Sequence, residues 1–245
     1  MLTYLQFHLI FILPPIVLLW LAGGWHPSRR FRVGMVLITV VAVLYTTPWD
    51  NYLIAREVWW YGPDTVLFRI GYAPIGEYLF FALQPVLTGL WLSRIAPDMR
   101  FRVGDFARRP RVAGAAAAVA LTITGIVLLQ WEWGLYLGAI LVWALPLIGV
   151  QWAVGGGYLW RQRRALLTAF IPPTLYLWAV DAVAIYLGIW QISTVRATGL
   201  RVGWFPIEEA IFFMVTNALV IAGVTLFVWV CDLWGWLEPT QPQGG

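Results

Sequence analysis

The sequence contains no lysine, a single cysteine and only two histidines. The absence of lysine excludes a retinal-binding receptor or pump, because the chromophore of such proteins needs a lysine Schiff base. The lone Cys231 excludes an intrachain disulfide, and no Cys/His cluster has the spacing of a metal site. A Gly-rich dinucleotide fingerprint and a P-loop are also missing, so we predict no metal and no flavin or nicotinamide cofactor.

Charge is scarce as well. Charged residues make up 11% of the chain, hydrophobic residues make up 61%, and mean hydropathy is +0.76, far from the range of soluble domains. A helix needs about 20 mostly apolar residues to cross a bilayer. Seven segments fit, at residues 3–22, 33–49, 75–94, 113–130, 135–158, 166–190 and 205–231. We therefore predict an all-α integral membrane protein with seven transmembrane helices.

The arginines predict the orientation of these helices. All sixteen basic residues are Arg, and twelve lie in three alternate loops, at Arg29, Arg30 and Arg32; at Arg94, Arg100, Arg102, Arg108, Arg109 and Arg111; and at Arg161, Arg163 and Arg164. Basic loops stay on the cytoplasmic side of a membrane. We therefore expect a multi-pass protein of the inner (plasma) membrane, with its N-terminus outside the cell and its C-terminus in the cytoplasm. This explanation also makes a nucleic-acid partner unnecessary, and none is predicted.

One phrase occurs twice, as GYAPIGEYLFF at residues 71–81 and GWFPIEEAIFF at residues 203–213, 132 residues apart. With the offset shortened by one residue, Asp50 and Trp59 also match Asp181 and Trp190. Internal repeats in membrane proteins usually mark duplicated helical bundles whose functional site lies at their junction. Both motif helices run from outside to inside. We therefore expect two repeats of three helices each, spans 1 to 3 and 5 to 7, and the two repeats should have the same orientation in the membrane.

Two parallel units with an odd number of helices need one extra span to return the chain. The Ala-rich stretch at residues 113–130 fits this linker, because its small side chains suit close helix contact. We therefore predict two parallel three-helix repeats joined by one linker helix. The first repeat covers residues 1–97, the basic loop and linker helix cover residues 98–133, and the second repeat covers residues 134–245.

Five carboxylates lie in or beside the predicted spans: Asp50, Glu77, Asp181, Glu208 and Glu209. Ionisable groups are costly at membrane depth and usually functional there. Helix capping is the alternative, because proline followed by glutamate suits the start of any helix. The first copy has Gly76 where the second has Glu208, so the two copies cannot be chemically equivalent.

The doubled unit, an acidic residue followed some 27 residues later by a Pro-Ile-(Glu)-Glu phrase with paired Phe, resembles the lycopene cyclase domain family. These small membrane carotenoid cyclases are unrelated in sequence to the flavin-dependent enzymes. The resemblance covers nearly the whole chain and is to the fused form, in which two three-helix domains are joined by an added span. It implies closure of the linear ψ ends of lycopene to β-ionone rings, giving β-carotene without net redox change.

Such a reaction needs an acid, a base and a surface that tolerates a carbocation. Carboxyl groups can act as acid or base according to their environment. We expect Glu208 or Glu209 to be the acid, with Glu77, Asp50 and Asp181 tuning it or receiving the proton. Aromatic rings can face a cation, and the residues expected to bind the substrate are Phe80, Phe81, Phe212, Phe213, Trp204 and Tyr72.

The implied partners are lycopene and the lipid bilayer, and the resemblance leaves open a homo-oligomer or contact with other carotenoid enzymes. Two other functions stay open: a hydratase or another end-group cyclase of the same family, and a proton-coupled transporter. The transporter is disfavoured because the first and fourth spans lack a polar pathway and the repeats are parallel. We expect lycopene to leave the lipid between helices of the two repeats and to reach the carboxylates through an apolar, aromatic tunnel.

Overall fold

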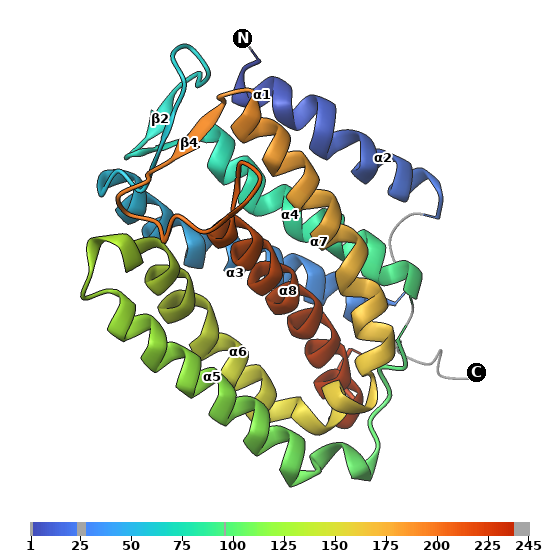
Figure 1. The fold of residues 1–245 in the computed structure, drawn as a ribbon. Helices are drawn as coiled ribbons and strands as arrows, with labels where there is room; N and C mark the ends of the chain where they lie inside the picture. The colour runs from blue at the N-terminus through green and yellow to red at the C-terminus, as the bar shows by residue number, and fades with distance from the viewer. Residues whose placement is uncertain (1, 24–27, 96, 238–245) are drawn as a thin grey trace.

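The computed structural model describes residues 2–23, 28–95 and 97–237. Within them lie seven helical segments long and apolar enough to cross a membrane, which confirms the predicted fold class (Figure 1). The first consists of α1 (Tyr4–Phe7), a π-helical turn (His8–Ile12) and α2 (Leu13–Leu21). The others are α3 (Arg29–Ala55), α4 (Ile75–Ile95), α5 (Arg108–Leu128), α6 (Leu135–Arg161), α7 (Arg163–Tyr186) and α8 (Ile207–Leu233). Two short 3₁₀ turns, Val103–Phe106 and Glu132–Gly134, precede α5 and α6.

Helices α4 and α8 form the centre of the bundle (Figure 1). Helix α4 packs against α2, α3, α7 and α8, while α8 also packs against α3, α6 and α7. Helix α5 lies at the edge and packs chiefly against α6. Its small residues permit this contact, because a Cβ added to Gly138 of α6 would lie only 2.8 Å from the carbonyl oxygen of Gly125.

Three pairs of short strands connect the helices at one end of the bundle. Strands β1 (Trp59–Tyr61) and β4 (Trp190–Ile192) come from distant parts of the chain and pair antiparallel, with Trp59 opposite Ile192. Two small hairpins, β2 (Arg69–Ile70) with β3 (Ala73–Pro74) and β5 (Arg201–Val202) with β6 (Phe205–Pro206), lead directly into α4 and α8. The sequence did not predict these strands, because two or three residues are too few to show a period.

Two of the helix ends that differ from the prediction lie near predicted carboxylates. The sixth span was expected to reach residue 190, but α7 ends at Tyr186 because Gly188 takes a left-handed φ of 71°, and the chain then enters β4. The second span was expected to end at residue 49, but α3 continues to Ala55. This extension places Asp50 inside the helix, within one turn of Pro48.

The hydrogen bonds around the two motif copies are alike. The backbone N–H of Ile75 donates to Phe68 O at 3.1 Å, and that of Ile207 donates to Leu200 O at 3.0 Å. At the first and fifth spans, the N–H of Tyr4 donates to Thr65 O at 2.7 Å and that of Tyr136 donates to Arg196 O at 3.0 Å. The division of the whole chain into two three-helix units stays a prediction.

Candidate active site

The acidic motifs occupy the first turns of α4 and α8. Glu77 lies in the first turn of α4, and Glu208 and Glu209 lie in the first turn of α8. In each case an extended proline, Pro74 or Pro206, ends the preceding hairpin and starts the helix. The two hairpins therefore deliver their carboxylates to the same end of the bundle.

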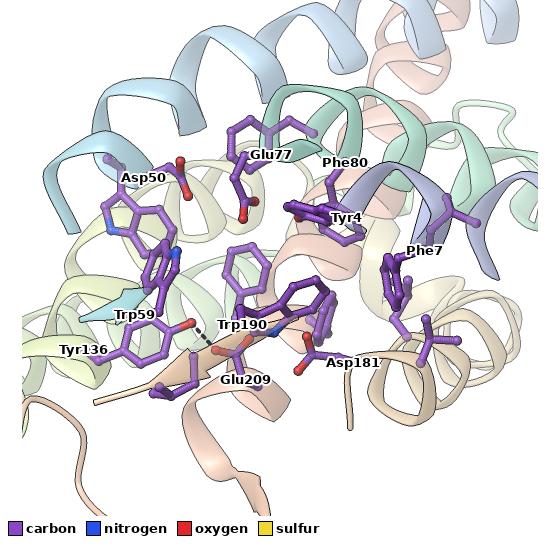
Figure 2. Close-up of a pocket in the computed structure, with 18 residues that line it drawn as sticks. Tyr4, Phe7, Asp50, Trp59, Glu77, Phe80, Tyr136, Asp181, Trp190 and Glu209 are labelled. Atoms are coloured by element: carbon purple, nitrogen blue, oxygen red, sulfur yellow. Dashed lines mark hydrogen bonds between the residues drawn. The ribbon is translucent and has the colours of Figure 1, made fainter. Parts of the chain in front are cut away.

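A cavity of about 60 Å³ lies between these helix starts (Figure 2). Four of the five predicted carboxylates line it: Asp50 from α3, Glu77 from α4, Asp181 from α7 and Glu209 from α8. The rest of its wall is aromatic or aliphatic, formed by Tyr4, Phe7, Ile12, Trp49, Trp59, Phe80, Phe81, Tyr136, Leu177, Val180, Trp190, Ile192, Phe212 and Phe213. Acidic groups thus converge in an otherwise apolar and π-rich space, which we call the carboxylate chamber.

Tyrosine hydroxyls hold two of the four carboxylates. Tyr61 donates to Glu77 Oε1 at 2.6 Å. Tyr136 donates to Glu209 Oε1 at 2.7 Å, as the dashed line in Figure 2 shows. Trp59 Nε1 in turn donates to the Tyr61 oxygen at 3.0 Å. Burial, reinforced by the neighbouring Glu77 and Asp50, raises the pKa of Tyr61 well above its usual value. The Tyr61 hydroxyl therefore keeps its proton and remains a donor.

The two aspartates are held less completely. Asp50 is 2% exposed and Asp181 is 4% exposed, yet the Oδ2 atom of each lacks a hydrogen-bond partner among the described residues. A buried polar atom without a partner costs roughly 1–3 kcal/mol. Helix capping does not explain Asp50 and Asp181, because both lie toward the C-terminal ends of α3 and α7, where the helix dipole disfavours a negative charge. Because the buried Oδ2 atoms of Asp50 and Asp181 destabilise the fold, their presence favours a chemical role for these two aspartates.

Glu208 is buried but is not part of the chamber wall. Its Oε1 accepts hydrogen bonds from the backbone N–H and the hydroxyl of Thr198, both at 2.6 Å. Thr198 belongs to the loop between β4 and β5. The geometry therefore gives Glu208 the position of a residue that fixes this loop, and of the two expected acids only Glu209 faces the chamber.

Tyr4 fills the corresponding place in the first copy. A Cβ built on Gly76 would overlap the Tyr4 ring, so no larger residue fits at that position while the ring is there. Tyr4 itself lines the chamber and packs against Trp190, with ring centroids 5.0 Å apart. The two motif copies are therefore inequivalent, as predicted: the Tyr4 ring lies against Gly76 in the first copy, and Glu208 binds the Thr198 loop in the second copy.

The predicted substrate residues divide into two groups. Phe80, Phe81, Phe212 and Phe213 all line the chamber, and the Phe80 and Phe213 rings meet edge to face at 6.0 Å. Tyr72 and Trp204 do not line it, since they are 61% and 54% exposed and lie on the turns of the hairpins. Each follows a glycine with φ near +65°, Gly71 (66°) or Gly203 (64°), which turns the chain outward.

A second cavity, of about 210 Å³, continues from the chamber between α3, α4, α6 and α8. Phe80, Phe81 and Phe212 line both spaces, so these rings form the boundary between them. Its other walls include Val41, Tyr45, Trp143, Leu147 and Val150. Val41 and Val150 are 51% and 60% exposed, which shows that this groove opens on the outer, lipid-facing surface of the bundle. We call this second cavity the apolar groove.

Sequence reasoning missed Tyr4, Tyr136 and Trp190 as residues of the chamber, and Tyr61 as the residue that donates a hydrogen bond to Glu77. Tyr4 and Tyr136 stand 132 residues apart, the same offset as the motif, so the repeat itself could have found them. Tyr61 gave no such signal, because it faces Trp190 in the β1–β4 pairing and has no tyrosine at the matching position. In the part of the chain that the structure describes, no group of three or more His, Cys, Asp or Glu side chains could hold a metal ion.

Comparison with known proteins identifies the family. The family model described as lycopene cyclase matches residues 2–94 and 130–229. The chain belongs to the lycopene cyclase family. The unmatched residues between the two parts include the basic loop and α5.

Curated relatives extend over most of the chain. A protein named lycopene beta-cyclase from Halobacterium salinarum is 44% identical over 235 residues, which cover 95% of this chain and 98% of the relative. Bifunctional lycopene cyclase/phytoene synthases from Sporisorium reilianum and Blakeslea trispora are 33% and 31% identical, over 92% and 90% of this chain. These alignments cover only 35% and 38% of the two fungal proteins, so the resemblance is confined to one part of each. No solved structure matches the chain.

Proposed function

We propose that this protein cyclises the linear ψ ends of lycopene to β-ionone rings and so forms β-carotene. The observation that carries the proposal is the convergence of four carboxylates in an aromatic chamber that shares three phenylalanine rings with an apolar groove. Membership of the lycopene cyclase family supports the same substrate and the same reaction. The reaction moves protons and closes a ring, so it requires no oxidant or reductant.

The chamber offers groups for each step. A proton adds to the terminal double bond and leaves a tertiary cation, the next double bond attacks that cation, and a proton leaves the new ring. Asp50 and Asp181 each have an oxygen without a hydrogen-bond partner among the described residues, and such an oxygen is suited to carry the proton that is given to the alkene. Glu77 and Glu209 each accept a tyrosine hydrogen bond, so we assign them to stabilising the cation and receiving the proton.

Aromatic rings complete the wall around the cation. The faces of Trp, Tyr and Phe attract cations by about 0.5–2 kcal/mol per ring. Trp49 and Phe212 lie parallel at 5.8 Å beside the chamber, and Phe80 and Phe213 close its other side. Glu208 does not contact the substrate in this proposal. It holds the loop that contains Thr198, and its neighbour in the sequence, Glu209, faces the chamber.

The apolar groove is the proposed site for the polyene. Lycopene is roughly as long as the hydrocarbon core is thick, about 30 Å. From Trp143 to Val150 the α6 wall of the groove is about 10 Å long at 1.5 Å per residue. The groove would therefore hold the part of the polyene next to the reacting end, while the remainder stays in lipid. The exposed side of the groove supports the lateral access from lipid that the sequence led us to expect.

Orientation and membrane are part of the proposal. The arginine-rich loops support a cytoplasmic C-terminus, and with this orientation the chamber would lie in the outer half of the plasma membrane. Two units built around the motif copies, with α5 as the added span, are supported by the equivalent hydrogen bonds at both copies and by the gap in the family match.

The test is product analysis. The gene is expressed in a bacterium that accumulates lycopene, and the extracted pigments are separated and identified by mass and absorption spectrum. We expect monocyclic and bicyclic β-ring products, and the same products from purified protein in lipid vesicles without added flavin. Unchanged lycopene in cells that carry the protein in their membranes would refute the proposal, and a hydroxylated acyclic product would indicate a hydratase instead.

A further inference from the structure

Strands β1 and β4 form a two-stranded ribbon with two different faces. Their residues alternate in burial, so that Trp59 is 7% exposed while its neighbour Trp60 is 45% exposed. In β4 the same alternation buries Trp190 and Ile192 and exposes Gln191. The buried face carries Trp59, Trp190 and Ile192 into the wall of the carboxylate chamber (Figure 2).

The ribbon is fastened at both ends. Gly62 N–H donates to Ile189 O at 3.1 Å, and Ser193 N–H donates to Val58 O at 2.8 Å, which continues the pairing beyond the strands. An ion pair between Arg196 and Glu57, 3.2 Å apart, joins the same two segments. The ribbon is thus a fixed cover over the chamber, made from the connection after α3 and the connection after α7.

The chemistry of the proposed reaction gives this cover a consequence. After the first proton transfer, the tertiary cation can be attacked by the next double bond or by a water molecule. Attack by the double bond closes the ring and moves the positive charge to the other carbon of that double bond. The attacking carbon then loses its proton to a base, and the double bond of the ring forms. Attack by water instead forms a carbon–oxygen bond, and the water gives one proton to the base. Both routes start from the same cation, so the outcome depends on whether water reaches it.

We propose that the β1–β4 ribbon excludes water from the chamber and thereby selects ring closure over hydration. This inference rests on the proposed function. Trp59, Trp190 and Ile192 are the specificity-determining residues, because they put apolar surface between the four carboxylates and the side of the ribbon that carries Trp60 and Gln191. Trp190 also packs on Phe7 and Tyr4, with ring centroids 5.1 and 5.0 Å apart, so little space remains beside it.

The test compares the two faces of the ribbon. Trp190→Ala and Ile192→Ala shorten side chains of the inner face, while Trp60→Ala and Gln191→Ala are matched changes on the outer face. Each variant is incubated with lycopene in vesicles made in water enriched in oxygen-18, and the pigments are analysed by mass. Ile192→Ala is included because it leaves the backbone pairing and all aromatic contacts in place, so it provides a result even where the larger change unfolds the cover.

We expect the inner-face variants to form a labelled, hydroxylated acyclic pigment, with the ratio of hydrated to cyclised product at least tenfold above wild type. The outer-face variants should keep the wild-type ratio. The inference is overturned if the inner-face variants, present in wild-type amounts, form rings without labelled alcohol, or if the outer-face variants hydrate equally. Failure of the proposed function looks different, because then the wild-type protein itself forms no ring.

Discussion

Replacing Glu209 by Gln separates catalysis from helix capping. As a capping residue, Glu209 would contribute about 0.3–1 kcal/mol through the helix dipole, and its loss would lower stability slightly without stopping turnover. As a group that receives a proton or stabilises the cation, it would contribute about 100- to 10,000-fold to the rate, which is about 2.7–5.4 kcal/mol. The two explanations therefore predict results that do not overlap.

The structure makes this change a mild one for the fold. Glu209 Oε1 accepts from the Tyr136 hydroxyl at 2.7 Å, and the amide oxygen of the Glu209→Gln variant can accept the same bond. We expect membrane insertion and melting temperature close to those of wild type, together with a loss of at least 100-fold in the initial rate of ring formation. The assay measures pigment conversion in vesicles, normalised to the amount of protein in the membrane.

Two further variants make the comparison specific. Glu208→Gln keeps an acceptor for Thr198 and alters no chamber group, so we expect it to lose less than tenfold in rate. Glu132→Gln, an exposed position in the turn before α6, should behave as wild type. Ring formation by Glu209→Gln at the wild-type rate would return Glu209 to a capping role. A larger loss in Glu208→Gln than in Glu209→Gln would show that the role of cation stabiliser and proton acceptor was assigned to the wrong glutamate.

Three other outcomes are expected. The Tyr61→Phe variant lacks the hydroxyl that donates to Glu77, a charge-assisted hydrogen bond worth about 1.5–3 kcal/mol, so ring formation should slow about 10- to 150-fold. The control variant Tyr52→Phe changes an exposed side chain whose hydroxyl accepts a hydrogen bond from Arg56, and its rate of ring formation should equal that of wild type. Burial raises the pKa of Asp105, but hydrogen bonds from Arg161 and Trp229 outweigh it and lower this pKa below its usual value. The ionised carboxylate therefore stabilises the fold above about pH 4, and this contribution is lost as acid protonates it. The Asp105→Asn variant should have a lower melting temperature than wild type at pH 7, and the difference should shrink at pH 3. A time course with wild-type protein should show a one-ring pigment that rises before the two-ring product, and its absence at every time point would argue against a single chamber.

The sequence predicted the main features of the fold because its strongest signals concern long elements. Seven apolar segments give seven helices, and the repeat placed Glu77 and Glu209 at matching helix starts, where the structure brings both to one cavity. The four phenylalanines of the motif followed from the same repeat. Each of these inferences depends on many residues together or on spacing along one helix.

Contacts between distant segments were beyond that reasoning. The β1–β4 ribbon depends on three residues from each strand, and the sequence matched Trp59 with Trp190 only as part of the repeat, without placing either of them in the wall of a cavity. Tyr72 and Trp204 were placed near the substrate because they belong to the motif, but the positive φ of the preceding glycines turns them outward. The sequence also left open whether Glu208 or Glu209 faces the chamber, because consecutive residues point about 100° apart on a helix. In the structure Glu208 binds Thr198 of the loop between β4 and β5, and Glu209 faces the chamber.

The unequal motif copies also bear on how a symmetric substrate is processed. In the first copy the Tyr4 ring lies where a side chain at residue 76 would extend, so no second carboxylate can enter there without displacing a wall of the chamber. In the second copy Glu208 is engaged with Thr198. Asp50 and Glu77 on one side and Asp181 and Glu209 on the other therefore line one shared space and do not form two separate sites. We therefore predict that a polyene with two identical ends places only one of them in that space at a time, and that closing the second ring requires the molecule to leave the apolar groove, turn in the lipid and bind again.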